Sequence, residues 1–147
     1  MLKTTQLKYD YDFIVIGSGS GGSVGAHYAR SLGKKVALFE KTKIGGECPN
    51  WACVPTKALL HSARTLEDAR NTIPFGVHAP DVSFRFKEVQ DYRALVVSRT
   101  GAADGSKSFE DQGIDVFHSK AEFISDHEIE SAGRKFSAKK FLIATGS

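Results

Sequence analysis

The 147-residue sequence is poor in cysteine, tryptophan and methionine, with two, one and one of each. Two cysteines confined to one six-residue segment cannot form the disulfide framework of a small secreted scaffold. No apolar run is long enough to cross a bilayer, and the first ten residues are polar and do not resemble a signal peptide. These absences predict a cytoplasmic protein with no membrane partner.

Charge of one sign is not concentrated anywhere in the sequence. The net charge is +3, and the basic residues are scattered in pairs such as Lys34-Lys35, Arg134-Lys135 and Lys139-Lys140. Nucleic-acid-binding proteins usually gather positive charge into one patch, so we expect no nucleic-acid partner. The 41% hydrophobic content is that of a folded globular protein, and the length corresponds to about one domain.

Glycine is abundant, with 14 residues, and the densest cluster follows an apolar run at 12–16. That run predicts a buried parallel strand. Small and apolar residues then recur at helical spacing from about 20 to 32, and a second apolar run covers 36–39. Strand, glycine turn, helix and strand in this order predict a βαβ unit with a right-handed crossover.

The rest of the sequence continues this alternation of helices and strands. We expect, in order, a helix at about 52–70, a loop at 71–82, a largely helical segment at 84–109 that the glycines at 101 and 105 can break, a strand at 114–118, a small antiparallel meander at 121–137 and a fourth buried strand at 141–144. The predicted fold class is α/β: a three-layer Rossmann-like domain with a parallel sheet and a small antiparallel meander.

The first glycine cluster fits the pattern G-x-G-x-x-G, with Gly17, Gly19 and Gly22 at the three glycine positions. The first glycine allows a tight turn, the second lets a pyrophosphate approach the backbone, and the third lets helix and strand pack closely. Glu40 ends the second strand, where a carboxylate can accept hydrogen bonds from both ribose hydroxyls and repels a 2′-phosphate. The pattern therefore predicts a dinucleotide other than NADP, without separating FAD from NAD.

Cys48 and Cys53 would point about 140° apart on a regular helix, too far for a disulfide. They can pair only if Cys48 lies in a distorted turn before the helix, which Pro49 and Pro55 favour. Cys53 would then lie near the helix start, where the dipole favours its thiolate, and Lys57 adds positive charge one turn later. Close thiols in a reducing compartment indicate a redox-active pair. Two unrelated buried cysteines, or half of a metal site, are the alternatives.

Three motifs in this order resemble the flavin-dependent pyridine nucleotide-disulfide oxidoreductases, which include dihydrolipoamide dehydrogenase, glutathione reductase and mercuric reductase. They are the glycine loop with Glu40, the segment 45–57 with its C-x-x-x-x-C core, and Ala144-Thr145-Gly146 after the fourth strand. The resemblance covers 11–147. It implies that the nucleotide is FAD and that electrons pass from the flavin to the Cys48–Cys53 pair and on to a substrate.

The same resemblance implies roles for individual residues. Cys48 would be the interchange thiol that attacks the substrate, Cys53 would face the flavin, and Lys57 would lie near flavin N5. No metal site is implied. The implied cofactor-binding residues are Gly17, Gly19, Ser20, Gly21, Gly22, Glu40, Lys41, Gly45, Gly46, Lys57, Ala121, Thr145 and Gly146.

The cysteine motif departs from the family's commonest wording at Glu47, Pro49, Trp51 and Ala52, none of which removes a reactive group. These changes leave the substrate open between lipoamide, glutathione and mercuric ion. Family members are several hundred residues long, so we expect 1–147 to be the N-terminal part of the FAD-binding domain, without the NAD(P)H and dimerisation domains of a homodimeric enzyme.

Two alternatives to this interpretation remain at the level of sequence. The chain could be a stand-alone flavin-carrying or redox-sensing module. It could also be the NAD-binding domain of another dehydrogenase, with incidental cysteines. The identity of the bound nucleotide separates the second alternative from the first interpretation.

Overall fold

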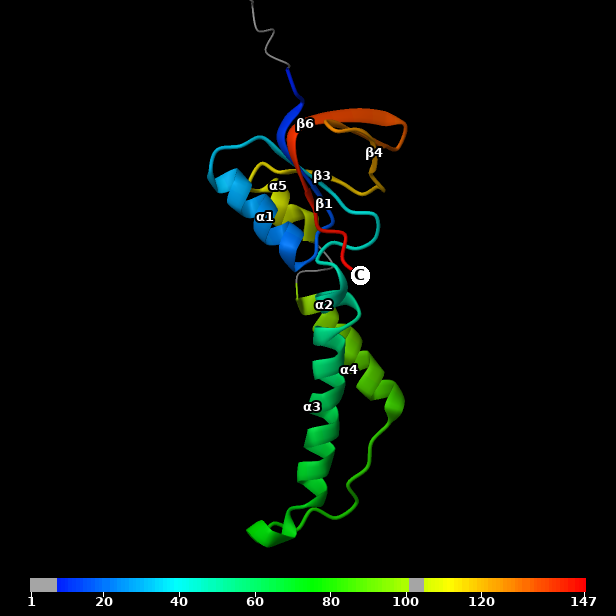
Figure 1. The fold of residues 1–147 in the computed structure, drawn as a ribbon. Helices are drawn as coiled ribbons and strands as arrows, with labels where there is room; N and C mark the ends of the chain where they lie inside the picture. Colours follow the sequence, from blue (N-terminus) through cyan, green and yellow to red (C-terminus); the bar gives the residue numbers. More distant parts are fainter. Residues whose placement is uncertain (1–7, 101–104) are drawn as a thin grey trace, which may run out of the picture. The chain divides into compact units, whose positions relative to one another are not determined.

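A computed structural model describes residues 8–100 and 105–147, and it divides the chain into two compact units (Figure 1). The first unit combines the chain up to Gly46 with the chain from position 104 onward. The second unit covers 47–103. Each unit has its own helices, and the first contains the sheet.

The first unit is built on a six-stranded sheet in the order β3-β2-β1-β6-β5-β4. Its strands are β1 (Tyr11–Ile16), β2 (Val36–Phe39), β3 (Asp115–Phe117), β4 (Glu122–Ser125), β5 (Glu128–Ser131) and β6 (Arg134–Ile143). β1 pairs in parallel with β2 and β6, and β2 pairs in parallel with β3, whereas β4, β5 and β6 are antiparallel neighbours. The predicted α/β class, parallel sheet and meander are confirmed.

Two helices cover one face of the parallel strands. Helix α1 (Ser20–Ser31) buries the small residues Gly22, Ala26 and Ala29, and α5 (Gly105–Glu110) buries Phe109. The side chains of Ala26, Ala29 and Phe109 pack with alternate strand residues in one apolar cluster. Because α1 presents glycine and alanine to the strands, helix and sheet approach closely, as the predicted βαβ unit requires.

The meander covers the other face and completes three layers. The cluster on this side contains Tyr11, Ile14, Ile16, Ala37, Phe39, Ile129, Phe136 and Ala138. Phe39 and Phe117 stack with their ring centroids 4.7 Å apart, and Phe136 lies edge-on to Phe39 at 5.1 Å. Side chains alternate between the two faces of a strand, and β1 and β2 contribute to apolar clusters on both faces. For this reason the sequences of β1 and β2 are continuous apolar runs.

The last segment of the meander and the last buried strand are one continuous strand, β6, not two. The sequence predicted separate segments at 134–137 and 141–144, because Lys139 and Lys140 interrupt the apolar pattern. In the structure β6 pairs with β5 through its first half and with β1 through its second half. The Lys139 ammonium lies 2.6 Å from a carboxylate oxygen of Asp12 on β1, so this lysine is accommodated at the sheet surface.

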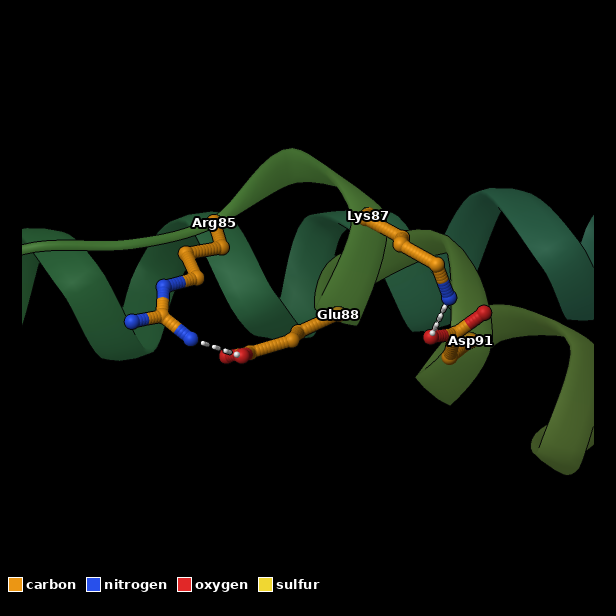
Figure 2. A network of polar contacts seen from close by, with 4 residues as sticks. All are labelled: Arg85, Lys87, Glu88 and Asp91. Carbon is orange, nitrogen blue, oxygen red and sulfur yellow. Dashed lines mark hydrogen bonds and ion pairs between the residues drawn. The ribbon is translucent and has the colours of Figure 1, made fainter.

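The second unit is helical. It contains α2 (Glu47–Asn50), α3 (Cys53–Arg70), the short 3-10 helix η1 (Ile73–Phe75) and α4 (Phe86–Arg99). Helices α3 and α4 contact one another, with the rings of His61 and Tyr92 6.3 Å apart. Figure 2 shows two ion pairs at the start of α4: Arg85, just before the helix, with Glu88, and Lys87 with Asp91. All four side chains are largely exposed, so the pairs contribute little to stability.

The helical segment predicted at 84–109 belongs to both units. Helix α4 ends at Arg99, and α5 begins at Gly105 within the first unit. The break expected at 101–105 falls mostly on 101–104, which lie outside the described residues. Within the described part of the chain, no helix is long and apolar enough to cross a membrane.

Candidate functional site

The glycine loop between β1 and α1 is held by close backbone contacts. Gly17 has φ +99°, and a Cβ atom there would collide with the carbonyl oxygen of Ala144. A Cβ atom at Gly22 would collide with the carbonyl oxygen of Gly17. Both positions therefore require glycine, for the turn at Gly17 and for helix packing at Gly22, as the motif predicts.

The middle of the loop faces free space instead. A Cβ atom at Gly19 would meet nothing within 4 Å. Gly19 is also the N-cap residue of α1, so the helix has no side-chain cap, and its first turn contains no acidic residue. The adjoining Ser20 and Gly21 are exposed. This arrangement leaves the positive end of the helix dipole accessible to an anion such as a pyrophosphate.

Glu40 lies just beyond β2 and is buried, with 6% of its surface exposed. One carboxylate oxygen, Oε2, accepts hydrogen bonds from the Ser18 amide (2.9 Å) and the Ser18 hydroxyl (2.7 Å). The other, Oε1, accepts from the Thr42 amide (2.8 Å) and the Thr42 hydroxyl (2.9 Å). Burial alone would raise the pKa of Glu40, but these four donors outweigh it and hold the pKa below its usual value.

Ser18 connects this carboxylate to a second glycine turn. Its hydroxyl accepts a hydrogen bond from the Gly45 amide at 3.0 Å. Gly46 has φ +68°, and a Cβ atom there would approach the Cα of Gly19 to 2.8 Å. The two glycine turns are therefore in contact, and Gly45 and Gly46, which the resemblance implies as cofactor-binding residues, lie beside the glycine loop.

Ser18 and Thr42 are two site residues that the sequence reasoning missed. Ser18 occupies an unspecified position of the glycine motif, and Thr42 lies outside it. Only the position of their hydroxyls around Glu40 identifies them. The predicted Lys41, between Glu40 and Thr42 in sequence, is exposed.

The end of β6 also reaches the loop. The Ala144 amide donates a hydrogen bond to the carbonyl of Ile16 at 2.8 Å, which places the following residues beside Gly17. The predicted Thr145 and Gly146 are exposed there. The predicted Ala121 lies elsewhere in the first unit, half-buried against the core on the meander side.

The two cysteines meet across a break between helices in the second unit. α2 ends at Asn50 and α3 begins at Cys53, and between them Ala52 has φ −115° and ψ −95°. Pro49 and Pro55 each lie in the first turn of their helix. The expected distorted turn before α3 is therefore present, with Cys48 in a single helical turn of its own.

Both cysteines are free thiols; Cys48 is half-buried and Cys53 is exposed. A hydrogen bond with the Cys53 side chain is the main cause that raises the pKa of Cys48 above its usual value, followed by burial and the negative charge of Cys53. The amide of Cys53, at the start of α3, and the positive charge of Lys57 act in the opposite direction.

These residues form two groups with separate chemistry. The first unit brings together the glycine loop, Glu40, the Gly45–Gly46 turn and Thr145. The second brings together Cys48 and Cys53, with Lys57 one turn along α3. In the residues that the structure describes, no group of three or more His, Cys, Asp or Glu side chains could hold a metal ion.

Comparison with known proteins gives consistent matches over this whole arrangement. The pyridine nucleotide-disulphide oxidoreductase family matches residues 11–147. Dihydrolipoyl dehydrogenase of Staphylococcus aureus is 36% identical over 141 residues, covering 92% of this chain and 30% of the relative. Mercuric reductase of Bacillus cereus is 32% identical over 139 residues, covering 95% of this chain and 22% of the relative.

Solved structures give the same result. The HOCl-induced flavoprotein disulfide reductase RclA from Escherichia coli, solved as a Cu(II) complex, superposes with a TM-score of 0.74 at 27% identity. The match covers 91% of this chain and 27% of that protein. The chain thus spans less than a third of the length of these relatives.

Proposed function

Because the chain belongs to the pyridine nucleotide-disulphide oxidoreductase family, we propose that it is the FAD-binding and dithiol-carrying part of a flavoprotein disulfide oxidoreductase of the dihydrolipoamide dehydrogenase type. One observation carries the proposal. A dinucleotide loop with an open phosphate face and two free cysteines on either side of a break between helices occur in one chain. A simple NAD-binding domain has no use for such a pair.

The first unit fits FAD in three respects. The backbone at Gly19 to Gly22 and the uncapped start of α1 would bind the pyrophosphate. The Glu40 carboxylate, whose pKa is lowered, stays ionised near neutral pH and would accept hydrogen bonds from the adenosine ribose. Thr145 and Gly146 would border the cofactor. When bound, FAD supplies a ring that exchanges an electron pair with a dithiol.

The cysteine pair would perform thiol–disulfide exchange. Cys48, as a thiolate, attacks one sulfur of a disulfide substrate, forms a mixed disulfide and releases the other sulfur as a thiol. Cys53 then attacks Cys48, which forms the Cys48–Cys53 disulfide and releases the second thiol. The substrate gains two electrons and two protons, and the cysteine pair loses them. The positive charge of Lys57 acts against the larger causes that raise the pKa of Cys48, and in this way favours the attacking thiolate.

The partners in the full enzyme are also part of the proposal. NADH or NADPH would supply the electrons, and a small disulfide, a dithiol or mercuric ion would be the substrate. The relatives include both a dihydrolipoyl dehydrogenase and a mercuric reductase, which supports this range. The nicotinamide site and a homodimer interface would come from other segments of a cytoplasmic enzyme.

Anaerobic reduction of the FAD-loaded chain tests the proposal. Excess dihydrolipoamide should bleach the flavin absorbance of the wild type, because electrons enter through the cysteine pair. Cys48→Ser and Cys53→Ser should each slow the bleaching strongly, while Ser62→Ala, a control on α3, should not. Equal rates in the wild type and both cysteine variants would contradict the proposed electron path.

A further inference from the structure

Both oxygens of Glu40 are already occupied by donors from this chain, and the two pairs of donors differ in burial. Ser18, which donates twice to Oε2, is fully buried. Thr42, which donates twice to Oε1, is exposed. A carboxylate offers about four acceptor positions, so the four bonds fill it. A ribose hydroxyl can bind Glu40 only where one of these donors gives way.

Ser18 and Thr42 differ in the free energy needed to break their hydrogen bonds to Glu40. The Ser18 hydroxyl also accepts a hydrogen bond from the Gly45 amide at 3.0 Å, so moving this hydroxyl would disturb two hydrogen bonds, one buried and one part-buried. Leaving buried polar groups unpaired is costly. The Thr42 hydroxyl can turn toward water, where it finds a new partner at little cost. The Oε1 side is therefore the side that opens.

We propose that Ser18 is a positioning residue that fixes Oε2 of Glu40, and that the Thr42 hydroxyl is a placeholder that a ribose hydroxyl of the nucleotide displaces from Oε1. The inference rests on the proposed FAD site. It assigns opposite effects on affinity to two hydroxyls that contact the same carboxylate. If the two hydroxyls only stabilised the fold, Ser18→Ala and Thr42→Val would change the FAD affinity in the same direction, because each substitution removes one hydrogen bond from the unliganded protein.

Quenching of flavin fluorescence on titration with FAD measures the two effects in the whole chain. Ser18→Ala should weaken FAD binding roughly tenfold to a hundredfold, as expected for a lost hydrogen bond to a charged group. Thr42→Val should tighten it about twofold to tenfold, because the competing hydroxyl is gone. Ser31→Ala and Thr65→Val are matched controls. Each removes an exposed hydroxyl bonded to a backbone carbonyl, and neither should change the affinity.

The outcomes separate this inference from the FAD proposal. Weaker binding by Thr42→Val, or unchanged binding by Ser18→Ala, overturns the inference. If Ser18→Ala does not fold, the sign of the Thr42→Val effect decides alone. If the wild type binds FAD, Glu40→Gln weakens this binding, and Ser18→Ala and Thr42→Val both lower the affinity, then only the roles proposed for Ser18 and Thr42 are wrong. No FAD binding by the wild type overturns both proposals.

Discussion

At the scale of single residues, the glycines of the first loop meet two different requirements. Gly17 and Gly22 have no space for a Cβ atom, because backbone carbonyl oxygens occupy it. Gly19 has free space around it and an extended backbone that alanine can adopt. Gly17 and Gly22 are needed for the fold, whereas the proposed FAD site requires glycine at position 19 for the approach of the pyrophosphate.

We therefore expect two alanine substitutions to separate stability from binding. Gly22→Ala should lower the free energy of unfolding by about 1–3 kcal/mol, the usual cost of overpacking. Gly19→Ala should leave stability nearly unchanged and weaken FAD binding at least tenfold, because its methyl group occupies the phosphate face. Urea unfolding and FAD titration of each variant provide the measurements. Equal losses of stability would show that Gly19 is also structural.

The buried carboxylate of Glu40 gives a pH-dependent prediction. Its pKa in the folded state lies below the usual 4.5, so its stabilising contribution is fully present above that pH. The contribution is lost as the pH falls through the folded-state pKa. We expect the wild type to lose more unfolding free energy between about pH 5 and pH 3 than Glu40→Gln does. Glu128→Gln, at an exposed position on β5, is the matched control and should follow the wild type.

The sequence could predict Glu40 but not its surroundings. A carboxylate after the second strand belongs to a known pattern, whereas the donors around it come from Ser18, 22 positions earlier, and from Thr42. Hydroxyl residues are common in turns, so neither gives a signal on its own. Their role depends on how the turn after β2 folds back onto the glycine loop, which is a tertiary contact.

At the scale of elements, the break between α2 and α3 determines the chemistry of the cysteine pair. One continuous helix would hold the two thiols apart, and the turn at Trp51 and Ala52 lets them meet. Helix and strand positions from the apolar pattern were largely confirmed, including β2 at Val36–Phe39 and the end of α3 at Arg70. The sequence did not predict the continuity of β6, because Lys139 and Lys140 interrupt the apolar pattern. The ion pair of Lys139 with Asp12 is a tertiary contact that only the structure shows.

From this break we predict that Cys48 and Cys53 form a reversible disulfide. Oxidation with diamide should protect both thiols from alkylation together, and mild reductant should release both, as mass spectrometry can count. Cys48→Ser should leave Cys53 alkylatable under the same oxidation. If Cys53 in that variant remains as protected as in the wild type, the two residues are not bonded to each other.

At the scale of the whole molecule, the chain holds one dinucleotide loop and one dithiol. Its relatives are more than three times as long. Transfer of a hydride from a nicotinamide to a flavin requires both rings to be held in contact. The sequence contains a single G-x-G-x-x-G fingerprint, at Gly17 to Gly22.

We therefore expect the 147-residue chain, supplied with FAD, not to oxidise NADH or NADPH with any disulfide. A steady-state assay with lipoamide, glutathione disulfide and mercuric ion checks this expectation. Turnover above about one per second, an ordinary enzyme rate, would show that the chain is catalytically sufficient by itself.

The central claim, that the first unit binds FAD, is tested most directly by calorimetric titration of the chain with FAD and, separately, with NAD. We predict that FAD binds more tightly, that it raises the unfolding temperature in a concentration-dependent way, and that Glu40→Ala weakens it by about 1–3 kcal/mol. Binding of NAD as tight as or tighter than that of FAD would contradict the account.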